Sequence, residues 1–296
     1  NKSVRSKASL TYDDVDGLYA DRYFQRYMLR LNNDFTINNM LGAKLDLNVR
    51  RAKNHTPNYS PFTTMRNMPA IYAAMWDDGR IAEGKSGGNP YGLLTMGGSS
   101  DSWSTQIGGK ASIELKPFKG FSLEANVAPF INYTKTKAFK KQAYYTLASD
   151  PEAFGGYLDE GGNRWETNKL SETRNDNYNV TSQLIANYMK TIGGHSITLM
   201  GGFENYYSKS ENLTADRDEY ILTEYPYLNL GPEDYRAKSG NANEYTYNSY
   251  FGRAIYNYNN KYLLQANIRR DGSCSFAQQY RSGTFPSVSG GWVLKE

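Results

Sequence analysis

Residues 262–296 read YLLQANIRRDGSCSFAQQYRSGTFPSVSGGWVLKE, and this stretch decides the fold. Its first segment alternates strictly between two kinds of side chain. The apolar set is Tyr262, Leu264, Ala266 and Ile268, and the polar set is Gln265, Asn267 and Arg269. A period of two is that of a β-strand with one apolar and one polar face. Because a polar loop and a second extended segment follow, the stretch predicts a hairpin that can contact lipid and water at once.

The same alternation recurs upstream. In the segments 41–49, 121–131 and 197–203, apolar residues occupy every second position and polar or charged residues mostly fill the positions between. The segments 177–189 and 245–258 alternate less regularly, and we interpret them as strands too. Short turns at 38–39, 117–120, 191–194 and 259–260 join such segments in pairs, and long polar loops separate the pairs. Short periplasmic turns and long extracellular loops are typical of bacterial outer-membrane barrels.

We therefore expect an all-β protein, with about ten strands of a large antiparallel transmembrane β-barrel. Plugged transporter barrels close with about 22 strands, so the missing strands would have to come from the same protein. Otherwise the sheet edges would expose unpaired backbone groups to hydrocarbon. Because the chain begins at Asn1 without a methionine or a targeting segment, we interpret it as a fragment or a processed piece.

The C-terminal hairpin also resembles a family signature. The run RRDGS followed by FPSVSGGW is similar to the SusC/RagA family of TonB-dependent outer-membrane transporters, which commonly carry RRDGSSRFG and then FPS-SAGW. The matching residues are Arg269, Arg270, Asp271, Gly272, Ser273, Phe276, Phe285, Pro286, Ser287, Gly290 and Trp292. Cys274 and Ser275 replace the usual Ser-Arg pair, so no role of that arginine transfers. The stretches 29–51 and 68–92 resemble the middle barrel region of the same family.

This resemblance implies a function. Residues 1–296 would form a barrel segment with its extracellular loops, while the plug domain, the TonB-contacting segment and the remaining strands lie outside this sequence. A SusD-like surface lipoprotein would close over the barrel and capture a glycan or peptide. TonB would then move the plug so that the cargo passes inward. The implied location is the outer membrane, in contact with its lipid and lipopolysaccharide.

Composition is compatible with this interpretation. No apolar run approaches the roughly 18 residues of a spanning helix, and averaging over an alternating strand hides its apolar face. The 26 tyrosines suit aromatic girdles at the membrane interfaces, although tyrosine-rich loops of a secreted binding protein would fit as well. The net charge of +4 is mild and spread along the chain, which argues against a nucleic-acid partner. A single cysteine excludes an internal disulfide framework.

The sequence shows little that is typical of a catalytic or metal-binding site. His55 and His195 are the only histidines, and neither begins a metal-ligand spacing. The acidic cluster at 13–16 lacks the spacing and the closing glutamate of a calcium loop. The sequence has neither a nucleophile elbow nor a phosphate-binding glycine loop. We therefore expect no enzyme activity and no cofactor.

Two sets of residues are candidates for binding. Aromatic rings of the long loops could stack on sugars or peptide side chains, the alternative being that they form small loop cores. These rings are Tyr72, Trp76, Tyr91, Tyr157 and Trp165. The spacing of Met68, Tyr72 and Trp76 predicts a short helix within 65–76, interrupted by Pro69.

The second set continues the outward-facing positions of four rising strands beyond their apolar bands. We call it the basic collar, and it comprises Arg51, Lys53, Lys135, Lys137, Lys209 and Arg270. Such cations could meet the phosphates of outer-leaflet lipopolysaccharide. Alternatively, they are ordinary solvated charges at strand ends.

Two other classes of protein remain open at this point. A passive porin or an outer-membrane enzyme would show the same alternation and loop asymmetry, but it would lack an N-terminal plug in the full-length protein. A soluble tyrosine-rich surface adhesin would stay dissolved without detergent, whereas a lipid-facing band should aggregate in water.

Overall fold

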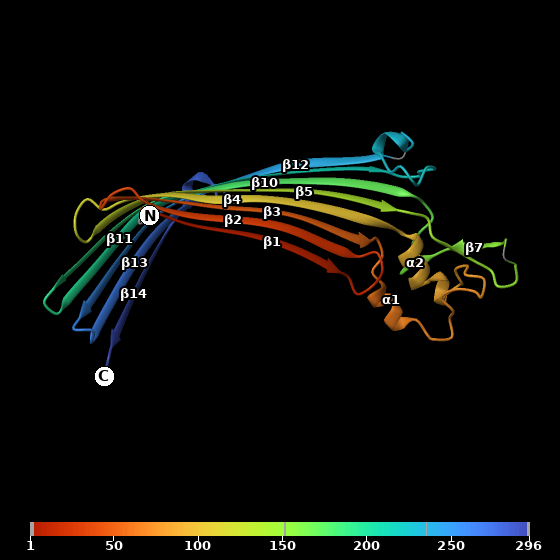
Figure 1. Cartoon of the computed structure of the whole chain (residues 1–296), viewed down its shortest axis with the longest axis horizontal. Coiled ribbons are helices and arrows are strands. Elements are labelled where there is room, and N and C mark those ends of the chain that lie inside the picture. Colours follow the sequence, from red (N-terminus) through yellow and green to blue (C-terminus); the bar gives the residue numbers. More distant parts are fainter. Residues whose placement is uncertain (1–2, 151, 235, 295–296) are drawn as a thin grey trace.

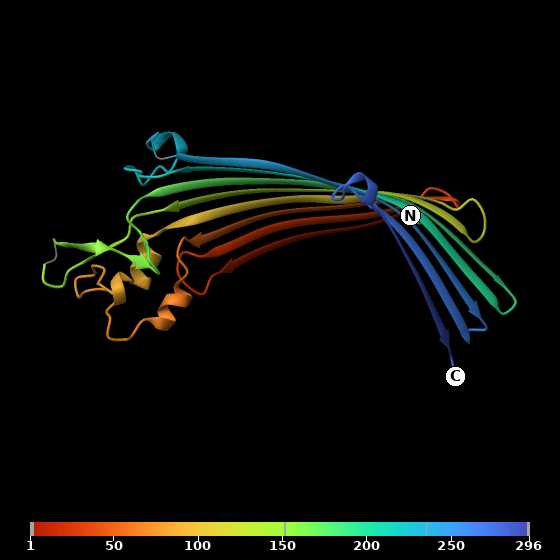
Figure 2. The same ribbon diagram turned by 180° about the vertical axis from the view of Figure 1, so that it is seen from behind.

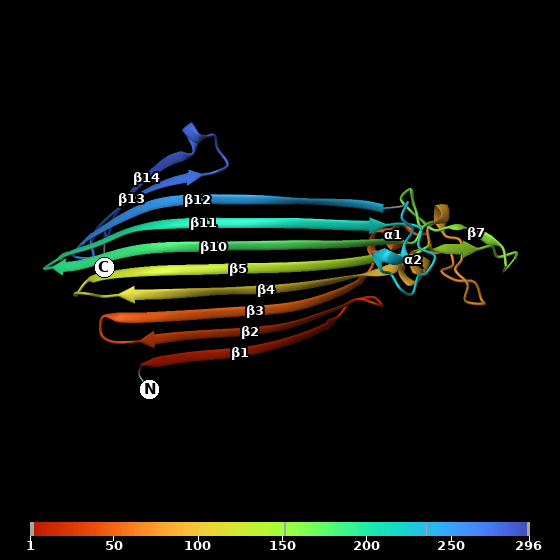
Figure 3. The ribbon, with the colours of Figure 1, turned by 90° about the horizontal axis from the view of Figure 1, so that it is seen from above.

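The computed structural model describes residues 3–150, 152–234 and 236–294, and a single ten-stranded antiparallel sheet dominates this part of the chain. The strands are β1 (Val4–Asp16), β2 (Tyr23–Thr36), β3 (Leu41–Pro57), β4 (Gly98–Leu115), β5 (Phe121–Lys140), β10 (Lys169–Ile192), β11 (His195–Arg217), β12 (Arg236–Tyr258), β13 (Tyr262–Ser273) and β14 (Ser282–Trp292). They lie side by side in chain order, with β1 and β14 as the two edges (Figure 3). The expected all-β fold with ten strands is confirmed, and the sheet is open.

The remaining elements are short and lie in the loops. They are α1 (Pro61–Asn67), η1 (Lys85–Gly87), α2 (Pro90–Met96), β6 (Tyr144–Thr146), β7 (Phe154–Tyr157), β8 (Asp159–Glu160), β9 (Asn163–Arg164), η2 (Leu228–Leu230) and η3 (Gln278–Tyr280). No helix of the described residues is long and apolar enough to cross a membrane.

The connections between strands differ in length at the two ends of the sheet. Both α-helices and β7 lie beyond one end of the sheet, and the short turns lie at the other end, where β1 begins and β14 ends (Figure 1). The view from behind shows the same separation and the curvature of the sheet (Figure 2). The predicted asymmetry between turns and loops is therefore present. We call the two ends of the sheet the turn end and the loop end.

The turns form where the sequence predicts them, because their residues tolerate a left-handed backbone. Asn259 and Asn260 both have positive φ (52° and 55°), as the tight turn between β12 and β13 requires. Gly120, before β5, has φ of 88°, and a Cβ there would lie 2.2 Å from the Met189 carbonyl oxygen. In the turn before β3, the Asn38 side-chain oxygen accepts hydrogen bonds from the amides of Met40 and Leu41.

Strand register places the apolar residues on one face. Leu10, Leu29, Val49, Ile107 and Ile131 are successive partners across five strands. On this outer face large apolar side chains remain exposed, for example 49% of Leu45 and 58% of Ile113. Such exposure over a whole sheet is unfavourable in water and suits a lipid contact.

The opposite, inner face is polar. A row of partners across it runs from Lys44 through Ser112, Asn126 and Gln183 to Glu204. Ser112 and Asn126 in this row are buried. The two faces therefore differ in chemistry as the alternation predicted.

Several boundaries differ from the sequence-based expectation. β10 covers Lys169–Ile192 and β12 covers Arg236–Tyr258, so both extend further toward the loop end than the alternation indicated. The added stretches are mostly polar on both faces, with Leu170 as the one large apolar residue, so they carry no apolar periodicity although their backbones pair. The helix expected within 65–76 is wrong, because α1 ends at Asn67. Pro69 has no N–H and disfavours a helical residue before it, and Met68 is accordingly extended at φ −86° and ψ 115°.

Candidate functional site

The loops between β3 and β4 (58–97) and between β5 and β10 (141–168) fold together at the loop end, and we call this unit the loop cap. Its core contains Tyr59, Leu93, Ala143, Leu158 and Trp165, all nearly inaccessible. Backbone hydrogen bonds tie the second loop to itself, from Leu158 N to Ala143 O (2.8 Å) and from Trp165 N to Leu158 O (2.9 Å). The main apolar core of the described chain therefore lies in the loops, not in the sheet.

Buried polar groups position α2 within the loop cap. Asn89 is the N-cap residue, and its side-chain oxygen accepts a hydrogen bond from Gly92 N at 2.9 Å. Its side-chain amide donates to the carbonyls of Ala74 and Ala82, each at 2.8 Å. One buried side chain therefore satisfies three backbone groups of the first loop.

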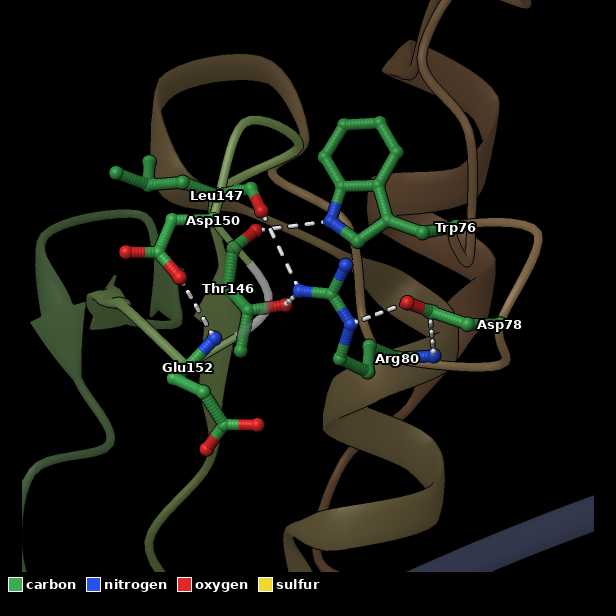
Figure 4. A network of polar contacts seen from close by, with 7 residues as sticks. All are labelled: Trp76, Asp78, Arg80, Thr146, Leu147, Asp150 and Glu152. Atoms are coloured by element: carbon green, nitrogen blue, oxygen red, sulfur yellow. Dashed lines mark hydrogen bonds and ion pairs between the residues drawn. The ribbon is translucent and has the colours of Figure 1, made fainter.

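A second polar network joins the two loops (Figure 4). Trp76 Nε1 donates to the Thr146 carbonyl at 2.9 Å, and Arg80 Nη1 donates to Thr146 Oγ1 at 2.6 Å. Arg80 Nε donates to Asp78 Oδ2 at 2.6 Å, and this bond holds the pKa of the Asp78 carboxyl below its usual value. Because Trp76 and Arg80 come from the first loop and Thr146 from the second, these bonds fix how the loops sit together.

An apolar groove of about 350 Å³ opens on the surface of the loop cap. Tyr72 and Tyr91 line it together with Met65, Met68 and Tyr19. Tyr72 and Tyr91 are partly exposed, so two of the five loop aromatics that the sequence singled out share one accessible surface.

The other three loop aromatics lie elsewhere. Trp165 is only 4% exposed, and its ring packs in the core of the loop cap with the Lys140 ammonium 4.4 Å from the ring centroid. Burial leaves this ring no free face for a cargo. Tyr157 packs edge-on against Phe154 at 4.9 Å, and Trp76 belongs to the polar network described above.

The basic collar occupies the outer face near the loop end. Lys53 and Lys135 flank Trp103 in one cross-strand row, with their ammonium groups 5.9 and 5.8 Å from its rings. Lys53 pairs with Asp101 at 3.3 Å, and Lys137 pairs with Glu172 at 3.8 Å. The carboxylates thus partly neutralise the lysines of the collar.

Lys209 pairs with Glu211 at 2.8 Å. Arg51 and Arg270 have no ion pair among the described residues. The two arginines are therefore the collar members with the freest charge.

Both histidines have neighbours on the strands. His195 Nδ1 lies 2.7 Å from the Tyr256 hydroxyl at the turn end. His55 lies between two carboxylates, with Nδ1 3.0 Å from Asp101 and Nε2 3.2 Å from Asp21. Among the described residues, no group of three or more histidine, cysteine or acidic side chains has the geometry to hold a metal ion.

The inner face carries a second candidate surface that sequence reasoning missed. Tyr206 on β11 lies directly opposite Tyr247 on β12, with ring centroids 5.1 Å apart and planes at 19°. Tyr245 adds a third ring at about 6 Å from both. The only signal in the sequence was the spacing of two between Tyr245 and Tyr247, within a segment whose alternation is irregular.

No protein-family model matches the chain. The TonB-dependent receptor SusC of Bacteroides thetaiotaomicron is 31% identical over 119 residues, which cover 40% of this chain and 12% of that protein. The TonB-dependent receptor P26 of Formosa agariphila is 24% identical over 314 residues, which cover 100% of this chain and 29% of that protein.

Among solved structures, the RagAB peptide importer in its open-open state has a similar fold, with a TM-score of 0.74 at 21% identity. The similarity covers 98% of this chain and 32% of the importer chain. The chain thus spans less than a third of the length of each of these relatives. In its hairpin signature, its named relatives and its fold, this chain is similar to a segment of the β-barrel of the SusC/RagA-like TonB-dependent transporters.

Proposed function

We propose that the protein containing this chain imports oligosaccharides or oligopeptides across the bacterial outer membrane in a TonB-dependent manner. The observation that carries the proposal is a sheet with an apolar outer face and a polar inner face in a chain similar to SusC. An apolar exterior suits hydrocarbon, and a polar interior suits a water-filled path for a polar cargo. The similarity in fold to a peptide importer supports the same class of activity.

In this proposal the partners act at the two ends of the sheet. A SusD-like surface lipoprotein covers the loop end, while TonB acts from the periplasm through a segment outside this sequence. The plug and the remaining strands of the same protein complete the barrel, because an open sheet edge cannot persist in hydrocarbon. Lipid and lipopolysaccharide surround the outer face.

The groove of the loop cap is the proposed first contact for cargo at the loop end. Tyr72 and Tyr91 present partly exposed rings there, and amphipathic rings suit sugar faces and peptide side chains alike. Replacing both by alanine should weaken capture of cargo by intact cells. The matched control is Tyr225→Ala, which removes an exposed ring of another loop at the same end. Equal capture by the double variant and the control would contradict this role.

The test of the proposed activity is uptake by cells that produce the full-length protein. Labelled oligosaccharide or oligopeptide mixtures should accumulate when TonB is present, and accumulation should stop in a strain without TonB or after a protonophore is added. Surface binding of the same mixtures should persist in both cases. Unchanged uptake without TonB would support a passive porin instead.

Two other outcomes would favour the remaining alternatives. Chemical conversion of the cargo by the purified protein would indicate an outer-membrane enzyme. Recovery of the folded full-length protein in buffer without detergent would favour a soluble adhesin, because the exposed apolar outer face should aggregate in water.

A further inference from the structure

On β10, β11 and β12, the inner face near the loop end carries uncharged polar side chains and tyrosines. On β10, alternate inner positions from 173 to 181 read Thr, Asn, Asn, Asn, Thr; on β11, those from 206 to 214 read Tyr, Ser, Ser, Asn, Thr. On β12, those from 239 to 247 read Ser, Asn, Asn, Tyr, Tyr. We call this surface the uncharged wall. The charges of the same strand segments, such as Arg174, Asp176 and Lys209, occupy the outer face.

The charged groups that border the uncharged wall on its turn-end side pair with one another. Glu204 accepts hydrogen bonds from Gln183 Nε2 at 2.5 Å, Tyr247 Oη at 3.0 Å and Arg269 Nη2 at 3.1 Å. Arg269 also donates to Asp271 at 2.7 Å and to Ser249 at 2.8 Å. The two carboxylates and one guanidinium leave this floor one net negative charge, and because Arg269 is bound to both carboxylates, it offers no free positive charge to a ligand.

Three tyrosine rings lie at the edge of the uncharged wall that faces the turn end. Tyr206 and Tyr247 stack against each other, and Tyr245 lies at a steeper angle beside them. The hydrogen bond from Tyr247 to Glu204 fixes one ring, so the group is held in place rather than free in solvent. Flat aromatic faces next to amide and hydroxyl groups combine stacking with uncharged hydrogen-bond donors and acceptors.

From this arrangement, we infer that the uncharged wall and its three tyrosines form a binding site for an uncharged oligosaccharide. The C–H faces of sugar rings stack on tyrosine, while their hydroxyls pair with asparagine, serine and threonine side chains. An oligopeptide carries an ionised carboxyl terminus, which would lose water on this surface without gaining an opposite charge. An acidic oligosaccharide would meet the same penalty. This inference rests on the proposed function as an importer and names its class of cargo.

The experiment measures binding to the purified full-length protein in detergent, with TonB absent. An array of uncharged oligosaccharides, uronic-acid oligosaccharides and oligopeptides is the probe, and affinities for bound members follow by calorimetry. We expect binding of uncharged oligosaccharides alone. Tyr206→Ala should weaken that binding about tenfold, equivalent to about 1.4 kcal/mol, and Tyr206→Phe should retain most of it because the ring remains.

The matched control is Tyr207→Ala, since Tyr207 is the next residue in sequence but lies on the outer face opposite Val180. Its affinity should equal that of the unmodified protein, and circular dichroism should show all variants folded. The inference is overturned if only peptides or acidic sugars bind, if no member of the array binds, or if the two alanine variants behave alike. A failure of energised uptake with intact sugar binding would instead overturn only the proposed import.

Discussion

Replacing Trp165 by alanine should destabilise the loop cap without unfolding the sheet. The indole is 4% exposed and packs in one core with Tyr59, Leu93 and Leu158, each of which is at most 1% exposed. Truncation of a buried tryptophan to alanine costs about 3–5 kcal/mol through lost burial and the cavity that remains. The Lys140 ammonium, 4.4 Å from the ring centroid, loses a favourable contact as well.

The assay is hydrogen exchange of the full-length protein in detergent, followed by mass spectrometry. Because each 1.4 kcal/mol is a factor of ten in an opening equilibrium, amides of the loop cap should exchange about 100- to 4,000-fold faster. The amides of Leu93 and Leu158 report directly, since both donate to backbone carbonyls within the loop cap. Exchange in the middle of β10 and β11 should stay unchanged, because those amides are held by the sheet ladder.

The control is Trp103→Ala, which removes the same side chain from the outer face of β4, between Lys53 and Lys135. It should leave exchange in the loop cap as it is. Unchanged exchange of the loop cap in the Trp165 variant would refute the reasoning, and so would uniform acceleration over the whole sheet. The first result would mean that Trp165 is not a core residue, and the second that the loop cap is not a separate unit of stability.

Three further outcomes follow from the structure. Burial raises the pKa of Glu160. The loop cap should therefore lose stability as pH rises from the unfolded-state pKa to this raised value. In the Glu160→Gln variant, the stability of the loop cap, measured by hydrogen exchange between pH 4 and 8, should not show this decrease. Leu199→Arg, on the exposed outer face, should destabilise the folded protein in lipid vesicles by about 2–4 kcal/mol, as measured by urea titration. Thr198→Arg, on the inner face, should destabilise it much less. Equal losses of stability would argue against a lipid contact. Arg51→Gln combined with Arg270→Gln should reduce the amount of lipopolysaccharide that copurifies with the protein. An unchanged amount would contradict the interpretation of the basic collar as a binding site for lipid phosphates.

The sequence by itself determined the sheet and its two faces. Strand alternation is a local property with a period of two, and turn residues such as Asn259 and Gly120 act within a few residues of their own position. Both could therefore be recognised without knowing what lies next to them. The family resemblance rested on a contiguous hairpin and was legible for the same reason.

Only the tertiary structure decided which candidate residues act together. Trp165 and Leu93 are far apart in sequence, and their packing depends on two loops that carry no shared periodicity. Tyr206 and Tyr247 meet because the register of β11 against β12 sets them opposite each other, and a shift of one residue would turn one of them to the outer face. Contacts between segments far apart in sequence depend on register and loop packing, which no local pattern specifies.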